Sequence, residues 1–297
     1  MMKILITGAA GQLGGEIVRM LSSGASELGE LPSVYSGAQV TAVDVDQADI
    51  TDGAAVSRLM QTVKPDVIFN CAAMTAVDAC QSDPETAMRV NAVGPRNLAM
   101  AAAGAGACLV HVSTDYVFSG DASVPYREWD VCCPRTVYGK SKLLGERYVE
   151  QFCDRYFIVR TAWLYGLTGK NFVKTMRRLG AEKSSVRVVN DQRGNPTNAE
   201  DLAYHLLLLA AGRDYGIYHC TGKGECSWYE FARRIMELSG LDCMVEPCST
   251  EEYAAAAPRP AYSSLDNLML RVTVGDRMRD WDEALRSYIR KLDQGVL

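Results

Sequence analysis

Short apolar segments alternate with longer segments of helical periodicity through the first half of the chain. The apolar segments lack the in-and-out alternation of a half-exposed strand and are typical of strands buried on both faces of a parallel sheet. We predict strands at 3–7, 40–44, 66–70, 107–112 and 156–160, and helices at 12–21, 54–63, 84–103 and 139–152. This alternation predicts an α/β fold with a Rossmann-like, doubly wound parallel sheet.

After residue 161 the pattern becomes less regular. Helical segments are predicted at 171–179, 199–211, 228–238 and 281–292. We interpret this part as a smaller mixed α/β substrate-binding lobe over the carboxyl edge of the sheet, where ligands of open α/β folds bind. The predicted domains are 1–165 with 198–220 for the dinucleotide, and 166–197 with 221–297 for the substrate. The Ser/Gly-rich stretch at 22–37 is expected to be a long surface loop.

Composition narrows the class of protein. Of the 297 residues, 48% are hydrophobic, and 31 Lys and Arg stand against 36 Asp and Glu. A net charge of −5 argues against a nucleic-acid-binding protein, which carries a strongly basic face. The longest apolar stretches, such as 206–211, fall far short of the roughly 20 residues of a membrane span. The first residues are interpreted as a strand rather than a signal peptide, so we expect a cytoplasmic protein.

The ten cysteines are scattered and contain no C-x-x-C pair. We interpret them as thiols in a reducing cytoplasm rather than as a disulfide scaffold or a zinc site.

A glycine-rich turn follows the first predicted strand and begins the first predicted helix. Its sequence, residues 8–14, places glycines at 8, 11 and 14. Gly8 allows a tight turn, Gly11 lets the backbone approach a pyrophosphate, and Gly14 permits close packing of helix on strand. The helix N-terminus adds free N–H groups and a positive dipole. The spacing is G-x-x-G-x-x-G rather than G-x-G-x-x-G, so an ordinary turn is the alternative, but the strand–turn–helix position favours dinucleotide binding.

The end of the second predicted strand indicates which dinucleotide is preferred. Asp44 lies there and can accept hydrogen bonds from an adenosine ribose hydroxyl. No Lys or Arg occurs between residues 40 and 55, so nothing local neutralises a 2′-phosphate. We therefore predict a preference for NADH, with NADPH as the possible alternative.

A tyrosine and a lysine one helical turn apart supply candidate acid–base chemistry. Tyr138 and Lys142 lie at i and i+4, downstream of Thr114, which comes immediately after the fourth predicted strand. Reduction of a ketone needs a hydride at carbon and a proton at oxygen. A phenol with an ordinary pKa near 10 is a poor acid–base group at neutral pH unless a nearby cation such as Lys142 stabilises the phenolate. The alternative is that Tyr138 packs in the core and Lys142 is a solvated surface charge.

With these residues in place, the chain resembles the extended short-chain dehydrogenase/reductases, and within them the dTDP-4-dehydrorhamnose reductase family. The resemblance extends over essentially the whole chain. Besides the glycine turn, it rests on 65–68, 70–78, 113–118, 138–142, 160–165, 171–172, 191–197 and 259–260. The Tyr/Lys pair is shared by the whole superfamily, whereas 75–78, 191–197 and 259–260 are more specific.

The resemblance implies NAD(P)H-dependent reduction of the 4-keto group of dTDP-4-dehydro-β-L-rhamnose, the last step of dTDP-L-rhamnose synthesis for surface polysaccharides. Tyr138 would be the proton donor, Lys142 its electrostatic partner and ribose ligand, and Thr114 a hydrogen-bond donor to the keto oxygen. The predicted cofactor-binding residues are Gly8, Gly11, Gln12, Leu13, Gly14, Asp44, Asp49, Ile50, Ala72, Ala73, Thr75, Tyr138 and Lys142. The predicted substrate-binding residues are Thr75, Val77, Thr114, Asp115, Trp163, Asn171 and Arg259.

Two other functions stay open at this point. One is a different nucleotide-sugar reductase or epimerase of the same superfamily. The other is a non-catalytic dinucleotide-binding subunit similar to the beta subunit of methionine adenosyltransferase. The expected partner is a small nucleotide-sugar, with no nucleic acid and no membrane, and the chain is expected to be a monomer or homodimer.

Metal binding is not expected. Some relatives form magnesium-bridged dimers through three glutamates. Glu16 and Glu200 match two of these, whereas the third position falls on Lys291. Because a cation there repels a metal ion, we expect no magnesium.

Overall fold

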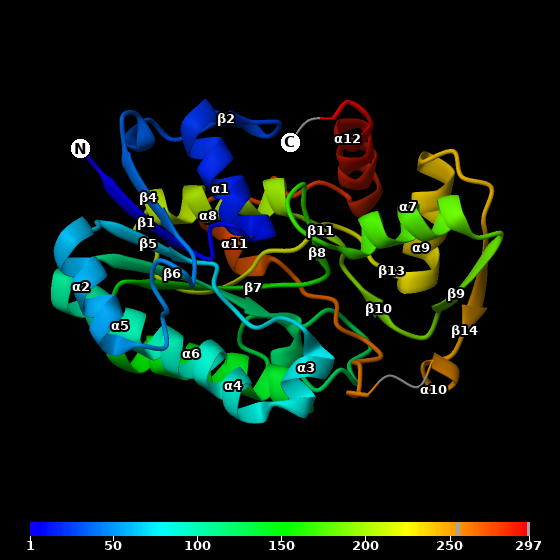
Figure 1. Ribbon diagram of the computed structural model, residues 1–297, viewed down its shortest axis with the longest axis horizontal. Helices are drawn as coiled ribbons and strands as arrows, with labels where there is room; N and C mark the ends of the chain where they lie inside the picture. The colour runs from blue at the N-terminus through cyan, green and yellow to red at the C-terminus, as the bar shows by residue number, and fades with distance from the viewer. Residues whose placement is uncertain (254–255, 296–297) are drawn as a thin grey trace.

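A six-stranded parallel sheet forms the larger part of the computed structural model, which describes residues 1–253 and 256–295 (Figure 1). From one edge to the other its strands are β12 (Gly216–His219), β7 (Tyr156–Thr161), β6 (Cys108–Thr114), β5 (Val67–Asn70), β1 (Lys3–Thr7) and β4 (Gln39–Val43). The predicted doubly wound α/β fold is confirmed. The prediction that every strand is buried on both faces is wrong for β4, because this edge strand leaves Gln39, Val40 and Ala42 exposed.

Helices cover both faces of the sheet. Alternate side chains of a strand point to opposite faces, so Ile4 and Ile6 join one core cluster with Ile17 of α1 (Gln12–Ser23) and Leu202 of α8 (Ala199–Ala211). Leu5 points the other way. It joins the cluster that holds side chains from α2 (Gly53–Val63), α5 (Gly94–Ala105) and α6 (Val137–Phe152). The sheet is therefore the middle of three layers, as Figure 1 shows.

The helix predicted at 84–103 is present, but it is not a regular α-helix throughout. The segment divides into α4 (Pro84–Met88), a π-helical turn (Arg89–Val93) and α5, preceded by α3 (Val77–Ser82). Pro95 has no N–H to give to the carbonyl four residues earlier, and its ring crowds the preceding turn. A widened turn accommodates this.

A second group of elements lies beyond the carboxyl edge of the sheet. The strands β9 (Ser185–Val189) and β14 (Met244–Cys248) pair in parallel, beside α7 (Phe172–Glu182), α9 (Trp228–Leu238) and α12 (Trp281–Asp293). Their apolar side chains form a separate core that includes Val173, Phe231 and Leu285. The shorter elements are β2 (Ala25–Ser26), β3 (Gly29–Glu30), β8 (Leu164–Tyr165), β10 (Arg193–Gly194), β11 (Thr197–Asn198), β13 (Cys226–Ser227), α10 (Thr250–Tyr253), α11 (Leu268–Val272) and the 3-10 turns Ser33–Tyr35 and Asp115–Val117. The proposed domain boundaries within the chain remain a prediction.

The stretch 22–37 is not a plain surface loop. It contains the hairpin of β2 and β3, whose Glu27 carboxylate pairs with Arg279 and Lys291 and accepts a hydrogen bond from the Ser287 hydroxyl. Although burial works in the opposite direction, these partners lower the pKa of Glu27 to about 2. Tyr35 is buried and donates to the carbonyl of Leu207 at 2.7 Å. The anchoring partners lie more than 170 residues away, so the local pattern could not reveal them.

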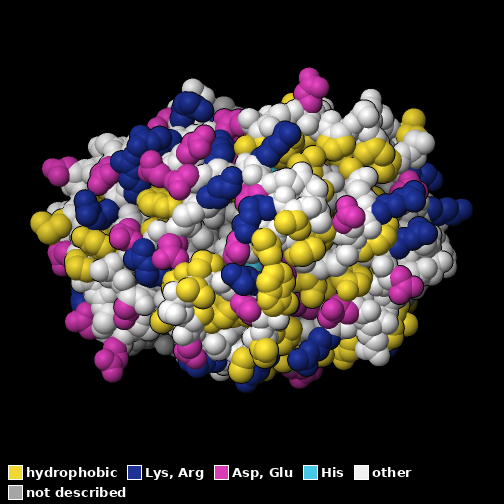
Figure 2. All heavy atoms as spheres, turned by 180° about the vertical axis from the view of Figure 1, so that it is seen from behind, with side chains coloured by type: hydrophobic (Ala, Val, Ile, Leu, Met, Phe, Trp, Pro, Cys, Tyr) yellow, Lys and Arg dark blue, Asp and Glu magenta, His cyan; other side chains and the backbone are white. Residues whose placement is uncertain are grey.

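Charges of both signs intermingle on the face shown in Figure 2. Within the described part of the chain, no helix combines the length and the apolar character that crossing a membrane requires.

A buried ion pair joins the sheet to α6. The guanidinium of Arg160 on β7 donates to both carboxylate oxygens of Glu146, at 3.0 and 2.7 Å, and the two side chains are 3% and 1% exposed. The Arg160 guanidinium also lies 5.2 Å from the centre of the Phe118 ring. This bidentate contact fixes the helix that carries Tyr138 and Lys142 against the strand beside it.

We expect Arg160→Met to lower the free energy of unfolding by about 3–5 kcal/mol, because Glu146 would keep a buried charge without its partner. Chemical denaturation measures the loss. Arg178→Met is the matched control, because Arg178 pairs with Glu182 at an exposed position and such pairs contribute less than about 1 kcal/mol. Equal losses in the two variants would contradict the assigned role of the buried pair.

Candidate active site

Two adjoining hollows lie over the carboxyl ends of the central strands. The larger encloses about 550 Å³ and the smaller about 430 Å³. Both are lined by Gly8, Gly11, Cys71 and Ala73, so they are two halves of one cleft that meet at the glycine turn. This is the edge at which the sequence predicts the ligands to bind.

The glycine turn is shaped by close backbone contacts. Gly8 has a φ of +68°, and a Cβ there would lie 2.6 Å from the Ala72 nitrogen. A Cβ at Gly14 would lie 2.3 Å from the Gly8 carbonyl oxygen. Both positions therefore require glycine. The N-cap residue of α1, Gly11, makes no side-chain cap hydrogen bond, so the first N–H groups of α1 stay available to an anion.

The smaller half of the cleft has acidic and apolar walls. Asp44, Asp49, Ile50 and Ala72 line it, as predicted for the adenosine half of a cofactor site, and no Lys or Arg is among the described residues that line it. The Asp44 carboxylate accepts from the N–H of Ala10 at 3.0 Å. Asp44 therefore also holds the glycine turn in place.

The larger half holds the predicted acid–base residues. Tyr138 and Lys142 line it from one face of α6, and both are buried. The Lys142 ammonium donates to the carbonyl of Val112 at 2.6 Å. A Cβ at Gly139 would lie 2.1 Å from the Tyr116 carbonyl oxygen, so only glycine lets the first turn of α6 come this close to the 3-10 turn after β6.

Burial sets the charge states of this pair. It raises the pKa of Tyr138 well above its ordinary value, with the neighbouring Thr114 hydroxyl acting in the opposite direction. Burial also lowers the pKa of Lys142 to about 8, and the Glu146 charge partly offsets this. The phenol is thus neutral at neutral pH and has a proton to donate, and the ammonium is largely retained below pH 8.

Most predicted substrate residues share the larger half of the cleft. Thr75, Val77, Thr114, Asp115 and Trp163 all line it, and so do the predicted cofactor residues Gln12, Leu13, Gly14, Ala73 and Thr75. The structure therefore brings the predicted acid–base, cofactor and sugar residues into one cavity.

Trp163 stands in this wall in an unusual conformation. Its φ is +47°, a left-handed value that costs a non-glycine residue about 1–2 kcal/mol. The Trp228 ring stacks on it, with ring centres 3.6 Å apart and planes 7° from parallel. A Cβ at Gly194 would lie 2.7 Å from the Trp163 ring, so glycine is required beneath it. The stacking of Trp228 and the close approach of Gly194 hold the strained tryptophan in place.

Two predicted substrate residues lie outside this cavity. The Asn171 side chain caps α7 by accepting from Lys174 N–H, and its amide donates to Gln12, Gly166 and Tyr288. Gln12 Oε1 also accepts from the N–H of Gly166 at 2.8 Å. The structure thus gives Asn171 a capping function.

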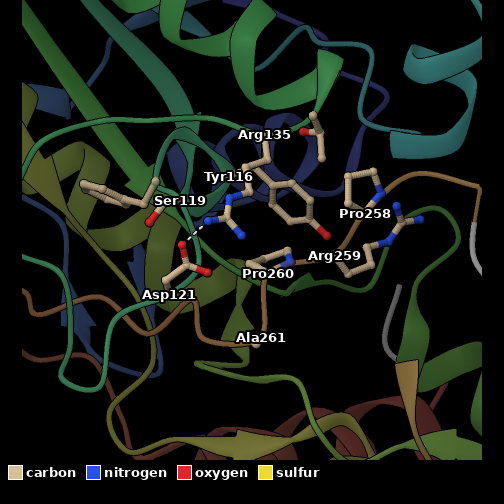
Figure 3. Close-up of a pocket in the computed structure, with 10 residues that line it drawn as sticks. Tyr116, Ser119, Asp121, Arg135, Pro258, Arg259, Pro260 and Ala261 are labelled. Carbon is tan, nitrogen blue, oxygen red and sulfur yellow. Dashed lines mark hydrogen bonds and ion pairs between the residues drawn. The ribbon is translucent and has the colours of Figure 1, made fainter. Parts of the chain in front are cut away.

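Arg259 lines a separate small pocket (Figure 3). Its guanidinium donates to Asp78 at 2.8 Å, while Arg135 and Asp121 form an ion pair on the other side of that pocket. Tyr116 lines both this pocket and the main cleft. Substrate contact by Arg259 therefore stays a prediction.

Three further residues belong to the site although the sequence patterns did not single them out. Trp228 and Lys170 line the larger half of the cleft. Asn91, in the π-helical turn, is fully buried and donates to the carbonyl of Met74 and to the Ser141 hydroxyl on α6. A buried Asn in an apolar helix is a signal that the sequence does offer.

Known proteins are similar to this chain over nearly its whole length. A family model described as the RmlD substrate binding domain matches residues 2–294. The chain belongs to the RmlD family. The Bacillus subtilis spore coat polysaccharide biosynthesis protein SpsK is 42% identical over 98% of both chains.

Solved structures agree with this membership. A dTDP-4-dehydrorhamnose reductase from Clostridium acetobutylicum has 48% identity and a TM-score of 0.93, covering 98% of this chain and all of that one. The dTDP-4-dehydrorhamnose reductase of Bacillus anthracis, in complex with NADP, has 40% identity and a TM-score of 0.91 over 98% of this chain and all of that one. The predicted family is confirmed.

Glu16 and Glu200, the carboxylates compared above with a magnesium site, are paired with basic side chains in this structure. Lys291 forms an ion pair with Glu200 and a second one with Glu27 at 3.2 Å. Arg19 contacts Glu16 through its Nε at 2.8 Å and Glu200 at 3.2 Å. The carboxylates are therefore neutralised by side chains, and these residues do not fit a divalent cation.

We expect a chelator such as EDTA to leave the thermal midpoint unchanged, and Lys291→Met to lower it by several degrees, because Glu200 is buried and would lose a charge partner. Differential scanning fluorimetry gives both values. Lys183→Met, an exposed lysine at the end of α7, is the control. A chelator-induced drop would contradict the interpretation.

Proposed function

We propose that this chain reduces the 4-keto group of dTDP-4-dehydro-β-L-rhamnose with a nicotinamide dinucleotide and releases dTDP-L-rhamnose. The observation that carries the proposal is the common cavity, in which the glycine turn, Tyr138 and Trp163 form parts of the same wall. A nicotinamide held by the glycine turn and a sugar ketone beside Tyr138 would meet there. Membership in the RmlD family supports the substrate class.

The chain's own residues supply everything except the hydride, which the bound nicotinamide would deliver to C4 of the sugar. Tyr138 donates the proton to the keto oxygen. The neighbouring Lys142 charge stabilises the phenolate that remains, and its side chain would also hold the nicotinamide ribose. Trp163 provides a flat apolar surface for the sugar ring. A positioned acid of this kind contributes about 10²–10⁴-fold to the rate.

The cofactor half of the cleft supports NADH as the preferred reductant. Asp44 and Asp49 line it, and no Lys or Arg does so among the described residues. A 2′-phosphate would lie beside carboxylates with no local cation. The structure of the Bacillus anthracis relative contains NADP. The proposed preference for NADH therefore rests on the residues that line this chain's cleft and not on the family.

The role in surface polysaccharide synthesis rests on relatives. The spore coat protein SpsK and the reductases of the RmlD family share the full length of this chain. We propose that the dTDP-sugar made here supplies such a polysaccharide.

We expect kcat/KM with NADH to exceed that with NADPH by about tenfold or more, corresponding to at least about 1.4 kcal/mol. The assay follows NADH oxidation with dTDP-4-dehydro-β-L-rhamnose generated in situ, and NADPH is run in parallel. Asp44→Ser should shrink the ratio, whereas Asp46→Ser, an exposed carboxylate outside the cleft lining, should not. Comparable values for the two cofactors in the unmodified enzyme would refute the preference.

We expect Tyr138→Phe to lower kcat at least about 100-fold while changing the Kd for NADH little, because only the donated proton is lost. Lys142→Met should lower kcat and weaken NADH binding together. The matched controls on α6 are Tyr148→Phe and Lys140→Met, neither of which lines the cleft. Stopped-flow turnover and fluorescence titration provide the two readouts. Wild-type kcat in Tyr138→Phe would mean that another group is the acid.

A further inference from the structure

The hydroxyl of Thr114 is already engaged within the protein. Its Oγ1 accepts from the N–H of Tyr116 at 3.2 Å and donates to Oδ1 of Asp115 at 2.8 Å. A hydroxyl has one hydrogen and two acceptor sites. While Asp115 is a carboxylate, it accepts that one hydrogen. Thr114 then has only a lone pair left, so it cannot donate a hydrogen bond to the oxygen of a ketone.

Asp115 is placed to change this. Its side chain lines the cleft and is 3% exposed, and its Oδ2 is buried with no hydrogen-bond partner among residues 1–253 and 256–295. No Lys or Arg of these residues forms an ion pair with it. Burial raises the pKa of Asp115 to about 6. The Thr114 hydroxyl and the nearby Ser263 hydroxyl, which makes no hydrogen bond to Oδ2, act in the opposite direction.

We propose that Asp115 is a positioning residue that acts through Thr114, and that its protonated form makes Thr114 a donor to the keto oxygen of the substrate. This inference rests on the proposed reduction of a sugar ketone. When Asp115 carries a proton, it donates to one acceptor site of Thr114 Oγ1 and the N–H of Tyr116 occupies the other. The Thr114 hydrogen is then released toward the cleft. No proton leaves Asp115 in the reaction, because Tyr138 supplies the transferred one.

The charge of Asp115 also favours reduction by the protonated form. Negative charge develops on the keto oxygen as hydride arrives, and donors aimed at that oxygen lower the barrier. An ionised Asp115 beside Thr114 would place a like charge near the same oxygen. Protonation thus both frees a donor and removes a repulsion.

The groups that surround Asp115 do not titrate in its range. Tyr116 faces it from its own 3-10 turn and Tyr138 faces it from α6, and burial raises the pKa of each phenol well above 10. Arg259 lies beyond Tyr116 and pairs with Asp78. Lys142 titrates separately, at about 8. A change in activity near pH 6 is therefore assigned to Asp115.

The test compares pH profiles of kcat/KM for the dTDP-4-keto sugar, measured at saturating NADH, for the unmodified enzyme and Asp115→Asn. The unmodified enzyme should lose activity at least about fivefold between roughly pH 5.5 and pH 7.5, because ionisation of Asp115 withdraws the Thr114 donor. The amide of Asp115→Asn donates to Thr114 at every pH. In this variant the fall in activity near pH 6, which is the descending limb of the pH profile, should therefore be absent whatever the absolute rate. A uniform loss at all pH values, or an unchanged limb, would overturn the proposal.

A second variant leaves Asp115 in place. Thr114→Val removes the hydroxyl, so its residual activity should also lack the limb near pH 6, whereas Thr114→Ser should keep it. Persistence of the limb in Thr114→Val would show that Asp115 acts independently of Thr114 and would refute the inference. Thermal midpoints confirm that each variant is folded.

The two proposals fail in different ways. If the unmodified enzyme oxidises no NADH with the dTDP-4-keto sugar at any pH, the proposed function is wrong. If it turns the sugar over without a limb near pH 6, the proposed function stands and the assignment to Asp115 is wrong.

Discussion

The backbone contact between the ends of β1 and β5 constrains the whole cleft. Gly8 packs against the peptide nitrogen of Ala72, and Gly14 packs against the carbonyl of Gly8, with no room for a side chain at either glycine. This contact brings the start of α1 directly over the sheet edge and leaves its N–H groups uncapped by side chains. An anion can therefore be held by backbone alone, and the charged side chains of the site remain free for chemistry.

Helix α6, which carries Tyr138 and Lys142, meets a comparable constraint. Gly139 and Gly145 allow α6 to lie against the backbone at Tyr116 and at Asn91, which brings Tyr138 and Lys142 out of water. Removal from water keeps the phenol protonated and makes the ammonium easier to lose. One packing arrangement thus sets both geometry and charge.

Much of the fold followed from local pattern. The buried strands β1, β5, β6 and β7 are short apolar runs, and the predicted helices 199–211 and 228–238 coincide with α8 and α9. The four-residue edge strand β12 was missed because it carries little apolar signal, and the hairpin of β2 and β3 was missed because distant ion pairs anchor it. Tyr138, Lys142 and the glycine turn could be located because their spacing is local, and Thr114 because it directly follows a predicted strand. The stacking of Trp228 on Trp163, and the use of Asn171 as a helix cap, depend on tertiary contacts that no single-sequence pattern encodes.

Gln12 gives the two lobes a direct mechanical link. Its side-chain oxygen receives hydrogen bonds from the N–H of Gly166 and from Asn171, so the first residue of α1 is tied to the loop that precedes α7. A dinucleotide that displaces this glutamine must rearrange the far lobe as well. By thermodynamic reciprocity, whatever factor the reductant contributes to sugar affinity, the sugar returns to the reductant. The affinities for the two ligands would then be coupled through one amide group.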